Sequence, residues 1–212
     1  MVDIAVVDYG MGNLRSVQQA VRKVAPNANI VVTGEAEVIA SARRVIFPGQ
    51  GAAPDCMREI RSRGLDKVIA EVVGDGKPFL GICMGLQVLF EHSAEGDTPC
   101  LGIFAGQVKR FASGLQSAQG SKLKVPHMGW NQVHHGDHAM WNGIAQDARF
   151  YFVHSYYVQP RDENLTQATS DYPQAFVCAV AQDNLFAVQF HPEKSAAAGL
   201  QLLRNFINWN PA

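Results

Sequence analysis

The chain has 212 residues, of which 47% are hydrophobic and 17% charged, so it can bury a sizeable core and is not intrinsically disordered. Its 18 lysines and arginines nearly balance 19 aspartates and glutamates, so charge gives no sign of binding to nucleic acid or to an anionic membrane. With no signal peptide, no bilayer-length apolar segment and no CxxC pair among four cysteines, we expect a cytoplasmic protein with reduced thiols and no membrane contact.

The first half of the chain alternates strand and helix signals. Short apolar runs predict strands over residues 3–8, 29–33, 44–49 and 78–82. Apolar residues at helical spacing predict helices over 14–24, from about 53 to 73 with a break near Gly64, and over 84–92. Asp8 ends the first strand, and we expect it to cap the following turn rather than to accept a phosphoryl group. The alternation predicts an α/β fold with a mostly parallel, flavodoxin-like sheet flanked by helices.

The second half has a different pattern. Strand-like segments at 102–111, 129–133 and 149–158 are separated by turns rich in glycine and serine. Residues 174–190 read as a hairpin with its tip at 182–184, and a last amphipathic helix is expected from about 197 to 209. No repeat or linker interrupts the chain. We therefore expect one domain over 1–212, with an antiparallel extension of the sheet in its second half.

Residues 81–85, Gly-Ile-Cys-Met-Gly, have the spacing of a nucleophile elbow, in which a strand turns directly into a helix. The central residue of such a turn is strained, and side chains two positions away on either side would collide, so glycine is needed at both. The turn would place the Cys83 sulfur above the carboxyl edge of the sheet, where the first amides of the helix favour a thiolate. A buried structural cysteine between packing glycines is the alternative.

His191 is the histidine best placed to act as a base for Cys83. It begins a His-Pro-Glu sequence directly after a predicted strand, and Pro192 stops that strand. Glu193 can accept a hydrogen bond from one ring nitrogen and leave the other facing the sulfur. Without a nucleophile these residues would merely cap a strand end, so the combination with Cys83 is what indicates catalysis.

A glycine-rich turn follows the strand at 44–49. Gly49 and Gly51 flank Gln50, and backbone amides of these three residues can stabilise a negative oxygen. A Pro-Gly pair after a strand is more often only a turn, so the segment is informative only together with the elbow.

Other reactive side chains are less well placed. A metal site is superficially suggested by three close histidines, but we favour a solvated turn because no matched cysteines or carboxylates accompany His134, His135 and His138. The remaining cysteines, Cys56, Cys100 and Cys178, have no base nearby in the sequence. We expect Cys178, in an apolar strand, to lie in the core.

Three elements in this order, PGxG at 48–51, GICxGxQ at 81–87 and HPE at 191–193, resemble the class-I, triad-type glutamine amidotransferase family over nearly the whole chain. Within it, DYGMGN at 8–13 and PHMGWN at 126–131 resemble the glutaminase subunits of imidazole glycerol phosphate synthase. Amidotransferases of anthranilate synthesis usually carry GxCLGHQ and PGPG instead, and the vitamin B6 glutaminase carries a GGES loop. Gln50 departs from the PGVG sequence common in this subfamily, which puts the energetics of that loop in doubt.

The resemblance implies that a Cys83 thiolate attacks the side-chain amide of glutamine, and that Glu193 orients His191, which exchanges protons with the thiol and the departing ammonia. Water then hydrolyses the glutamyl thioester. It further implies an oxyanion site formed by amides of Gly49, Gln50, Gly51 and Met84. The residues implied to hold glutamine are Gly51, Gln87, Glu95, Ser155 and Tyr156; for Glu95 a mobile acidic loop is the alternative. No cofactor or metal is implied.

A synthase partner is also implied, because ammonia released into water would be protonated and lost as a nucleophile. For this family the partner is a (β/α)₈-barrel cyclase, bound as a heterodimer, that forms imidazole glycerol phosphate and AICAR in histidine biosynthesis. Glutaminase activity is then expected to stay low until the partner carries its ligand. The residues expected at the docking face are Asn13, Arg15, His127, Met128 and Trp130; an aromatic and methionine cluster that packs the core is the alternative.

Other functions stay open from the sequence. A different synthase partner would keep the glutaminase chemistry and change only the docking face. A cysteine hydrolase or chaperone-like protein of the same broad architecture typically carries its acid before the elbow strand, which the HPE sequence argues against. A non-enzymatic binding partner would predict a broken triad, whereas here the three residue types are intact.

Overall fold

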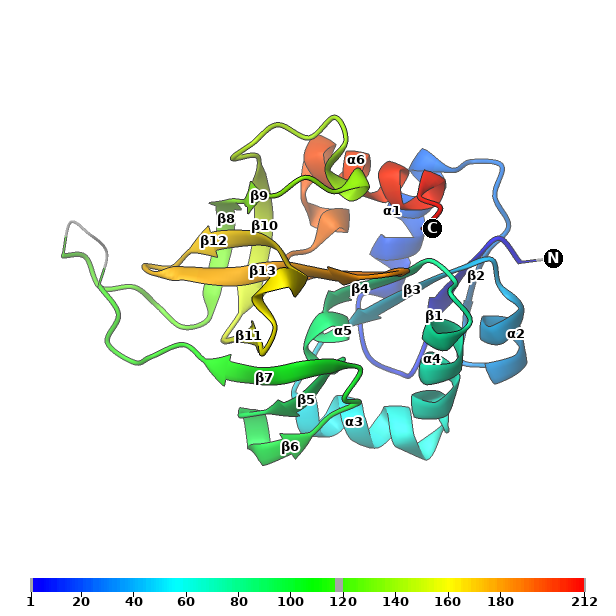
Figure 1. Ribbon diagram of the computed structural model, residues 1–212, viewed down its shortest axis with the longest axis horizontal. Helices are drawn as coiled ribbons and strands as arrows, with labels where there is room; N and C mark the ends of the chain where they lie inside the picture. Colours follow the sequence, from blue (N-terminus) through cyan, green and yellow to red (C-terminus); the bar gives the residue numbers. More distant parts are fainter. Residues whose placement is uncertain (1, 117–119, 212) are drawn as a thin grey trace.

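The computed structural model describes residues 2–116 and 120–211. Figure 1 shows a twisted sheet with helices on both faces in the first half and a β-rich region in the second. The strands, in chain order, are β1 (Ile4–Val7), β2 (Ile30–Thr33), β3 (Arg44–Gly49), β4 (Phe79–Cys83), β5 (Phe90–Ser93), β6 (Thr98–Pro99), β7 (Phe104–Arg110), β8 (His127–Gln132), β9 (His134–His135), β10 (Arg149–His154), β11 (Tyr156–Pro160), β12 (Thr166–Asp171), β13 (Ala175–Gln182) and β14 (Leu185–Val188).

The helices connect and cover these strands. The α-helices are α1 (Leu14–Val24), α2 (Ala36–Ser41), α3 (Ala53–Ser62), α4 (Leu65–Gly74), α5 (Met84–Gln87) and α6 (Ala196–Asn208). The short 3₁₀ helices are η1 (Glu95–Asp97), η2 (Ala139–Trp141), η3 (Glu163–Leu165) and η4 (Pro192–Lys194). Within the described part of the chain, no helix is both long and apolar enough to cross a membrane.

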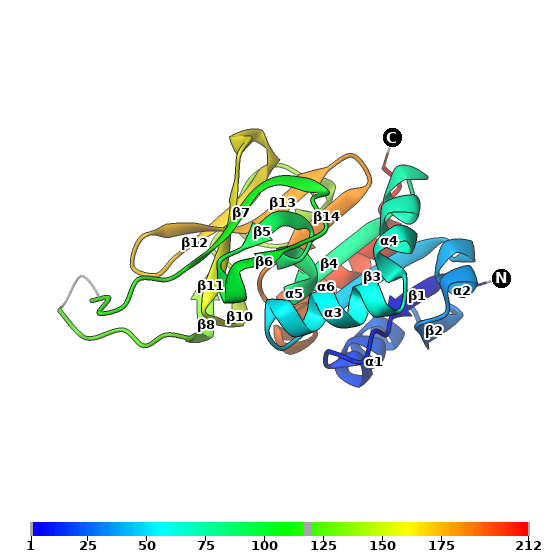
Figure 2. The same cartoon turned by 90° about the horizontal axis from the view of Figure 1, so that it is seen from below.

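The main sheet has the order β2-β1-β3-β4-β14-β13-β11-β7-β5-β6, and a separate antiparallel pair is formed by β10 and β8. The five strands from β2 to β14 are parallel, whereas β13, β11 and β7 continue the sheet antiparallel. The predicted α/β fold with an antiparallel extension is therefore confirmed. The two halves meet near β4, β14 and α5 (Figure 2).

Two apolar cores lie on opposite faces of the sheet. Helices α1 and α6 pack on one face, where Val17, Val21 and Phe206 are buried, and α2, α3 and α4 cover the other. Strands β1 and β4 are buried at every position because both of their faces are covered, which is why they read as continuous apolar runs. The carboxyl ends of β3, β4 and β14 therefore emerge together at one edge.

Most predicted elements of the first half are confirmed. Strands β1 to β4 and helix α1 lie where the apolar pattern predicts them. Gly64 adopts a left-handed conformation with φ of 67° and separates α3 from α4, which is the predicted break. Asp8 accepts a hydrogen bond from the Gly10 amide at 2.8 Å, so it caps the turn after β1 as expected.

The predicted helix over 84–92 is wrong. Helix α5 ends at Gln87, and the chain continues as β5, whose neighbour is β7. The carbonyls of Leu89 and Phe90 accept hydrogen bonds from the amides of Phe104 and Gly102 at 2.9 and 2.8 Å. Every residue from 84 to 90 is buried, so no polar face distinguishes a helix from a strand in this segment.

The second half follows the predicted strands with two differences. The hairpin is confirmed as β13 and β14, with Asp183 at φ 51° in its turn, and the last helix is confirmed as α6. The expected strand over 149–158 breaks at Ser155 into β10 and β11, which belong to different sheets. Strand β12 was not predicted, because its sequence is mostly polar with only Ala168 and Ser170 buried.

Candidate functional site

Cys83 ends β4 in the strained conformation that its sequence spacing predicts. Its φ of 56° and ψ of −110° are rarely adopted by residues with a side chain. A Cβ atom on Gly81 would lie 2.8 Å from the Gly85 carbonyl oxygen, and one on Gly85 would lie 1.8 Å from the Phe47 carbonyl oxygen. Both glycines are therefore required by close backbone approaches, one within the elbow and one against β3.

The helix after the elbow is shorter than the sequence pattern predicts. Helix α5 has a single turn of four residues, so its dipole is much weaker than that of the expected nine-residue helix. Cys83 is 7% exposed, and its sulfur accepts a long hydrogen bond from Gln189 Nε2 at 3.8 Å. Stabilisation of a thiolate must therefore come mainly from neighbouring side chains.

His191 and Glu193 form a buried pair beside Cys83. His191 Nδ1 lies 2.9 Å from Glu193 Oε1, and both side chains are less than 5% exposed. His191 Nε2 is buried and makes no hydrogen bond of ordinary geometry to the described residues. Burial alone would lower the pKa of His191, but the Cys83 sulfur and the Glu193 carboxylate outweigh it and raise the pKa to about 10. The Glu193 carboxylate therefore favours the protonated form of the His191 imidazole, which can act as a proton donor beside the sulfur.

The backbone of His191 is fixed from two sides. Its amide donates to the Tyr151 carbonyl at 2.9 Å, and Ser195 Oγ donates to its carbonyl at 2.6 Å. The same Ser195 oxygen accepts a hydrogen bond from the Tyr151 amide at 2.9 Å. A Cβ atom on Gly199 would lie 2.0 Å from the Pro192 carbonyl oxygen, so α6 also presses directly on this turn. These contacts fix the backbone position from which the His191 imidazole extends towards the elbow.

A cavity of about 420 Å³ lies over the sulfur of Cys83. Every residue that the family resemblance implies for holding glutamine is on its wall, and so are both members of the cysteine–histidine pair. The lining residues are Gln50, Gly51, Cys83, Met84, Gln87, Glu95, Pro126, Val153, His154, Ser155, Tyr156, His191 and Lys194. The structure thus brings together residues from six separate segments of the chain.

Gln87 lines this cavity and has one hydrogen-bond acceptor without a partner among the described residues. Its Nε2 donates to the Tyr156 carbonyl at 3.1 Å and to Gln189 Oε1 at 3.0 Å, which uses both of its N–H groups. Its Oε1 is buried and has no partner among the described residues. The Tyr156 carbonyl can only accept, so it fixes the orientation of the Gln87 amide. Gln189, which the sequence reasoning missed, therefore accepts from Gln87 and donates to Cys83.

Glu95 is anchored rather than mobile. Its Oε2 accepts a hydrogen bond at 2.9 Å from the amide of Ala53, the first residue of α3. A Cβ atom on Gly96 would lie 2.5 Å from the Pro54 ring, so η1 packs against the start of the same helix. This geometry disfavours the alternative of a free acidic loop and holds a carboxylate at the cavity wall.

The glycine-rich turn after β3 lies beside the elbow. Gly49 pairs with Cys83 in the sheet, and a Cβ atom on it would lie 2.8 Å from Met84 Cβ. Gly51 has φ of 98°, and a Cβ there would lie 2.7 Å from the Met11 side chain. The DYGMGN segment therefore packs on this turn. Gln50, Gly51 and Met84 line the cavity, whereas Gly49 lies behind them.

The other cysteines are poor nucleophiles. Burial raises the pKa of Cys56 and of Cys100 to about 11, and it also raises the pKa of Cys178 well above its ordinary value. Cys178 is fully buried in β13, so its expected place in the core is confirmed. These thiols stay protonated at neutral pH, which leaves Cys83 as the cysteine at the cavity.

The residues expected at a docking face are only partly exposed. Met128 and Trp130 on β8 are 62% and 47% exposed and are the exposed large hydrophobic residues of the described chain. Arg15 is exposed near the start of α1, and Asn13, which precedes that helix, is half-buried. His127 is only 4% exposed, so in this conformation it lies beneath the surface rather than on it.

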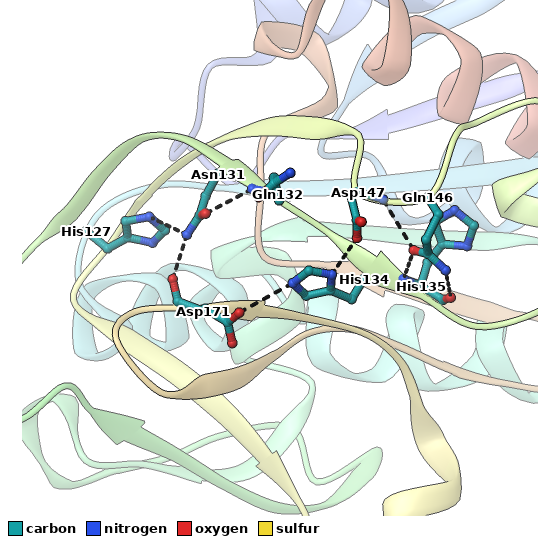
Figure 3. Close-up of polar contacts among 8 residues, drawn as sticks. All are labelled: His127, Asn131, Gln132, His134, His135, Gln146, Asp147 and Asp171. Carbon is teal, nitrogen blue, oxygen red and sulfur yellow. Dashed lines mark hydrogen bonds and ion pairs between the residues drawn. The ribbon is translucent and has the colours of Figure 1, made fainter. Parts of the chain in front are cut away.

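The three close histidines do not form a metal site. Figure 3 shows His134 between Asp147 and Asp171, with His135 beside Gln146. No group of three potential ligands with metal-binding geometry occurs among residues 2–116 and 120–211. The expected solvated turn is only partly correct, because His134 and His135 form the short strand β9 and His138 caps η2.

Comparisons with known proteins identify the family of this chain. The family model for class-I glutamine amidotransferases matches residues 5–209. The imidazole glycerol phosphate synthase subunit HisH of Thiobacillus denitrificans is 64% identical and covers 99% of this chain and 92% of its own. The same subunit of Dechloromonas aromatica is 58% identical, with 98% and 97% covered.

A solved glutamine amidotransferase structure, 18% identical to this chain, superposes with a TM-score of 0.73 over 96% of this chain and 97% of its own, which supports the fold alone. The extent and identity of the sequence matches decide the family. The chain belongs to the class-I glutamine amidotransferases and, within them, to the HisH subunits of imidazole glycerol phosphate synthase.

Proposed function

We propose that this chain hydrolyses glutamine to glutamate and ammonia, with Cys83 as nucleophile, His191 as proton carrier and Glu193 as the group that orients His191. The observation that carries the proposal is a single cavity in which the strained Cys83 elbow meets the buried His191–Glu193 pair. The chemistry requires a cysteine nucleophile next to a group that can exchange protons with it. The buried His191–Glu193 pair, on the same cavity as Cys83, supports these roles.

The proposed reaction begins with attack of the Cys83 sulfur on the carboxamide carbon of glutamine. The oxyanion is stabilised by backbone amides of the turn Gly49–Gly51 and of Met84, which adjoin the elbow. The proton held by His191 passes to the leaving nitrogen, and ammonia departs. His191 then takes a proton from water as it hydrolyses the glutamyl thioester.

In the proposal, two hydrogen-bond acceptors on the cavity wall hold the nitrogen-bearing groups of glutamine. Gln87 Oε1, the acceptor without a partner, suits an N–H group of the substrate. Glu95 suits the α-ammonium group, and Gly51, Ser155 and Tyr156 complete the wall. We further propose that residues 1–212 form one amidotransferase domain and that the protein works in the cytoplasm.

The partner in the proposal is a cyclase subunit of (β/α)₈-barrel type, bound as a heterodimer and supplied directly with ammonia. Support comes from the relatives, which are named as subunits of imidazole glycerol phosphate synthase. Exposed Met128 and Trp130 are apolar side chains of the kind that centre protein interfaces. Asn13 and Arg15 are proposed to lie at the same docking face.

A coupled assay tests the proposal. The chain is mixed with a candidate barrel cyclase and the cyclase's ribonucleotide ligand, and glutamate release from glutamine is measured. We expect stimulation that depends on both the cyclase and its ligand. Glutamate release that the cyclase leaves unchanged would point to another synthase partner, and no release under any condition would contradict the glutaminase assignment.

A further inference from the structure

A hydrogen-bonded chain of buried groups connects the exposed strand β8 to the cavity. From the surface inward it contains Asn131, His127, His154 and the carbonyl of Tyr156, and that carbonyl also holds Gln87. Successive contacts measure 3.3 Å from Asn131 Nδ2 to His127 Nε2, 2.9 Å from His127 Nδ1 to His154 Nε2, and 2.8 Å from His154 Nδ1 to the Tyr156 oxygen. His127 and His154 are 4% and 5% exposed.

The outer end of this chain has a fixed polarity. The side chain of Asn131 accepts from the Gln132 amide through Oδ1 at 2.9 Å and donates through Nδ2 to the Asp171 carbonyl at 2.8 Å (Figure 3). A backbone amide can only donate and a backbone carbonyl can only accept, so the Asn131 amide cannot be flipped. Asn131 therefore presents an N–H group to His127, and His127 Nε2 must be an acceptor without a proton.

The inner end has the complementary polarity. The Tyr156 carbonyl can only accept, so His154 Nδ1 must carry a proton and donate it. Between the two fixed ends, one arrangement satisfies every contact without charging either ring. Both imidazoles are neutral and protonated at Nδ1, and His127 donates to His154 Nε2. Protonation of either ring would put an N–H group against another N–H group.

The surroundings favour these neutral rings. His127 stacks on Tyr172 and Phe152 with ring centroids 4.0 and 5.0 Å apart, and it makes edge contacts with Phe111 and Phe176. Burial lowers the pKa of His127 to about 4. Burial also lowers the pKa of His154 to about 3, although its hydrogen bond to the Tyr156 carbonyl acts in the opposite direction. Among the titratable groups nearby, the Tyr172 hydroxyl donates to the Lys124 carbonyl, and the Asp171 carboxylate pairs with His134.

The cavity end of the chain acts on a substrate contact. The Tyr156 carbonyl receives one hydrogen bond from His154 and one from Gln87, so its position sets the orientation of the Gln87 amide. Gln87 lines the cavity, and its Oε1 has no hydrogen-bond partner among the described residues. We propose that His127 and His154 are positioning residues, locked in one neutral tautomer, that transmit the position of strand β8 to the glutamine-binding acceptor Gln87. This inference rests on the proposed glutaminase function and assigns the pair a role in it.

One experiment determines the tautomers of the two rings by NMR and needs no activity assay. The free chain is labelled with ¹⁵N-histidine, and long-range ¹H–¹⁵N spectra are recorded at pH 7, with assignments from His127→Asn and His154→Asn. We expect both imidazoles to be neutral and protonated at Nδ1. A cationic ring, or a proton on Nε2 of either one, would overturn the inference. Asn131→Leu, of nearly the same shape but without the donor, is expected to release His127 into a mixture of tautomers.

A second experiment compares variants matched in size. Asn and Leu have similar shapes, but only Asn offers an amide N–H close to the position of His Nδ1. Glutamine hydrolysis is measured with the barrel cyclase and its ligand, and kcat and KM are separated. His154→Leu is expected to raise the KM for glutamine about tenfold over His154→Asn, the usual effect of one lost hydrogen bond. Equal KM values would show that His154 only packs.

The link to the surface has its own test. Asn131 does not line the cavity, yet Asn131→Leu is expected to raise the KM for glutamine several-fold. Gln132→Leu, an exposed change at the next position of β8, should leave it unchanged. An Asn131→Leu enzyme with a wild-type KM would overturn the connection. If the wild-type complex releases no glutamate at all, the proposed function fails, and the NMR spectra still decide the tautomers.

Discussion

Acid pH is expected to destabilise this fold through the buried histidine pair. Burial lowers the pKa of His127 to about 4 and that of His154 to about 3, against 6.5 for an ordinary histidine. As pH falls below 6.5, both histidines therefore gain a proton in the unfolded chain but stay neutral in the folded chain. The stability contributed by the neutral rings is complete above pH 6.5 and is lost as pH falls towards the folded pKa values.

The size of the effect follows from linkage. At pH 5 the unfolded rings are almost fully protonated and the folded rings almost fully neutral, which costs about 2 kcal/mol per histidine relative to neutral pH. The pair together should cost about 4 kcal/mol, a large share of a typical domain's stability. The figure depends little on the exact folded pKa values as long as both lie well below 5.

Urea unfolding at pH 7 and pH 5 measures this loss. His154→Asn removes one of the two rings, so its loss between these pH values should be about 2 kcal/mol smaller than that of the wild type. His134 provides a control of opposite sign. The Asp147 hydrogen bond raises its pKa, so its contribution is present below pH 6.5 and fades as pH rises through the folded pKa. His134→Asn should therefore lose more stability on acidification than the wild type. Equal losses of unfolding free energy between pH 7 and pH 5 in the wild type and in His154→Asn would contradict the role of the neutral rings.

Three further changes have defined outcomes. Gly85→Ala places a Cβ atom 1.8 Å from a carbonyl oxygen of β3 and should cost at least about 3 kcal/mol in urea unfolding, whereas Gly74→Ala, with open space around it, should cost nothing measurable. Glu193→Gln should lower kcat about 100-fold with little change in KM, because the catalytic imidazole loses the carboxylate that orients it; an unchanged kcat would contradict that role. Trp130→Ala should weaken cyclase binding by about 1–3 kcal/mol in titration calorimetry and leave thermal unfolding of the free chain unchanged; unaltered affinity would remove β8 from the docking face.

The elbow could be predicted from the sequence because its causes are local. The approach that requires Gly81 lies within the elbow, and although Gly85 is required by the adjacent strand β3, both glycines stand at fixed positions two residues from Cys83. The same holds for His191 and Glu193, whose hydrogen bond spans two positions of one turn. Such short-range geometry leaves a pattern that one sequence can reveal.

The remaining features depend on tertiary pairing. The end of α5 is decided by β7, which supplies the backbone partners that draw the following residues into a sheet. Gln189 meets Gln87 only because β14 lies beside β4. His127 and His154 face each other because β8 and β10 pair in one particular register. None of these pairings leaves a periodic signal, so the sequence reasoning could not place them.

The central claim is that Cys83 forms a covalent glutamyl thioester, and trapping that species tests it most directly. The complex of this chain with its ligand-loaded cyclase is mixed with glutamine, quenched in acid within one turnover and examined by intact mass and peptide mapping. We expect a glutamyl adduct on the peptide that contains Cys83, and neither adduct nor hydrolysis in a folded, partner-binding Cys83→Ala variant. An adduct on Cys56, Cys100 or Cys178, or glutamine hydrolysis by Cys83→Ala, would contradict it.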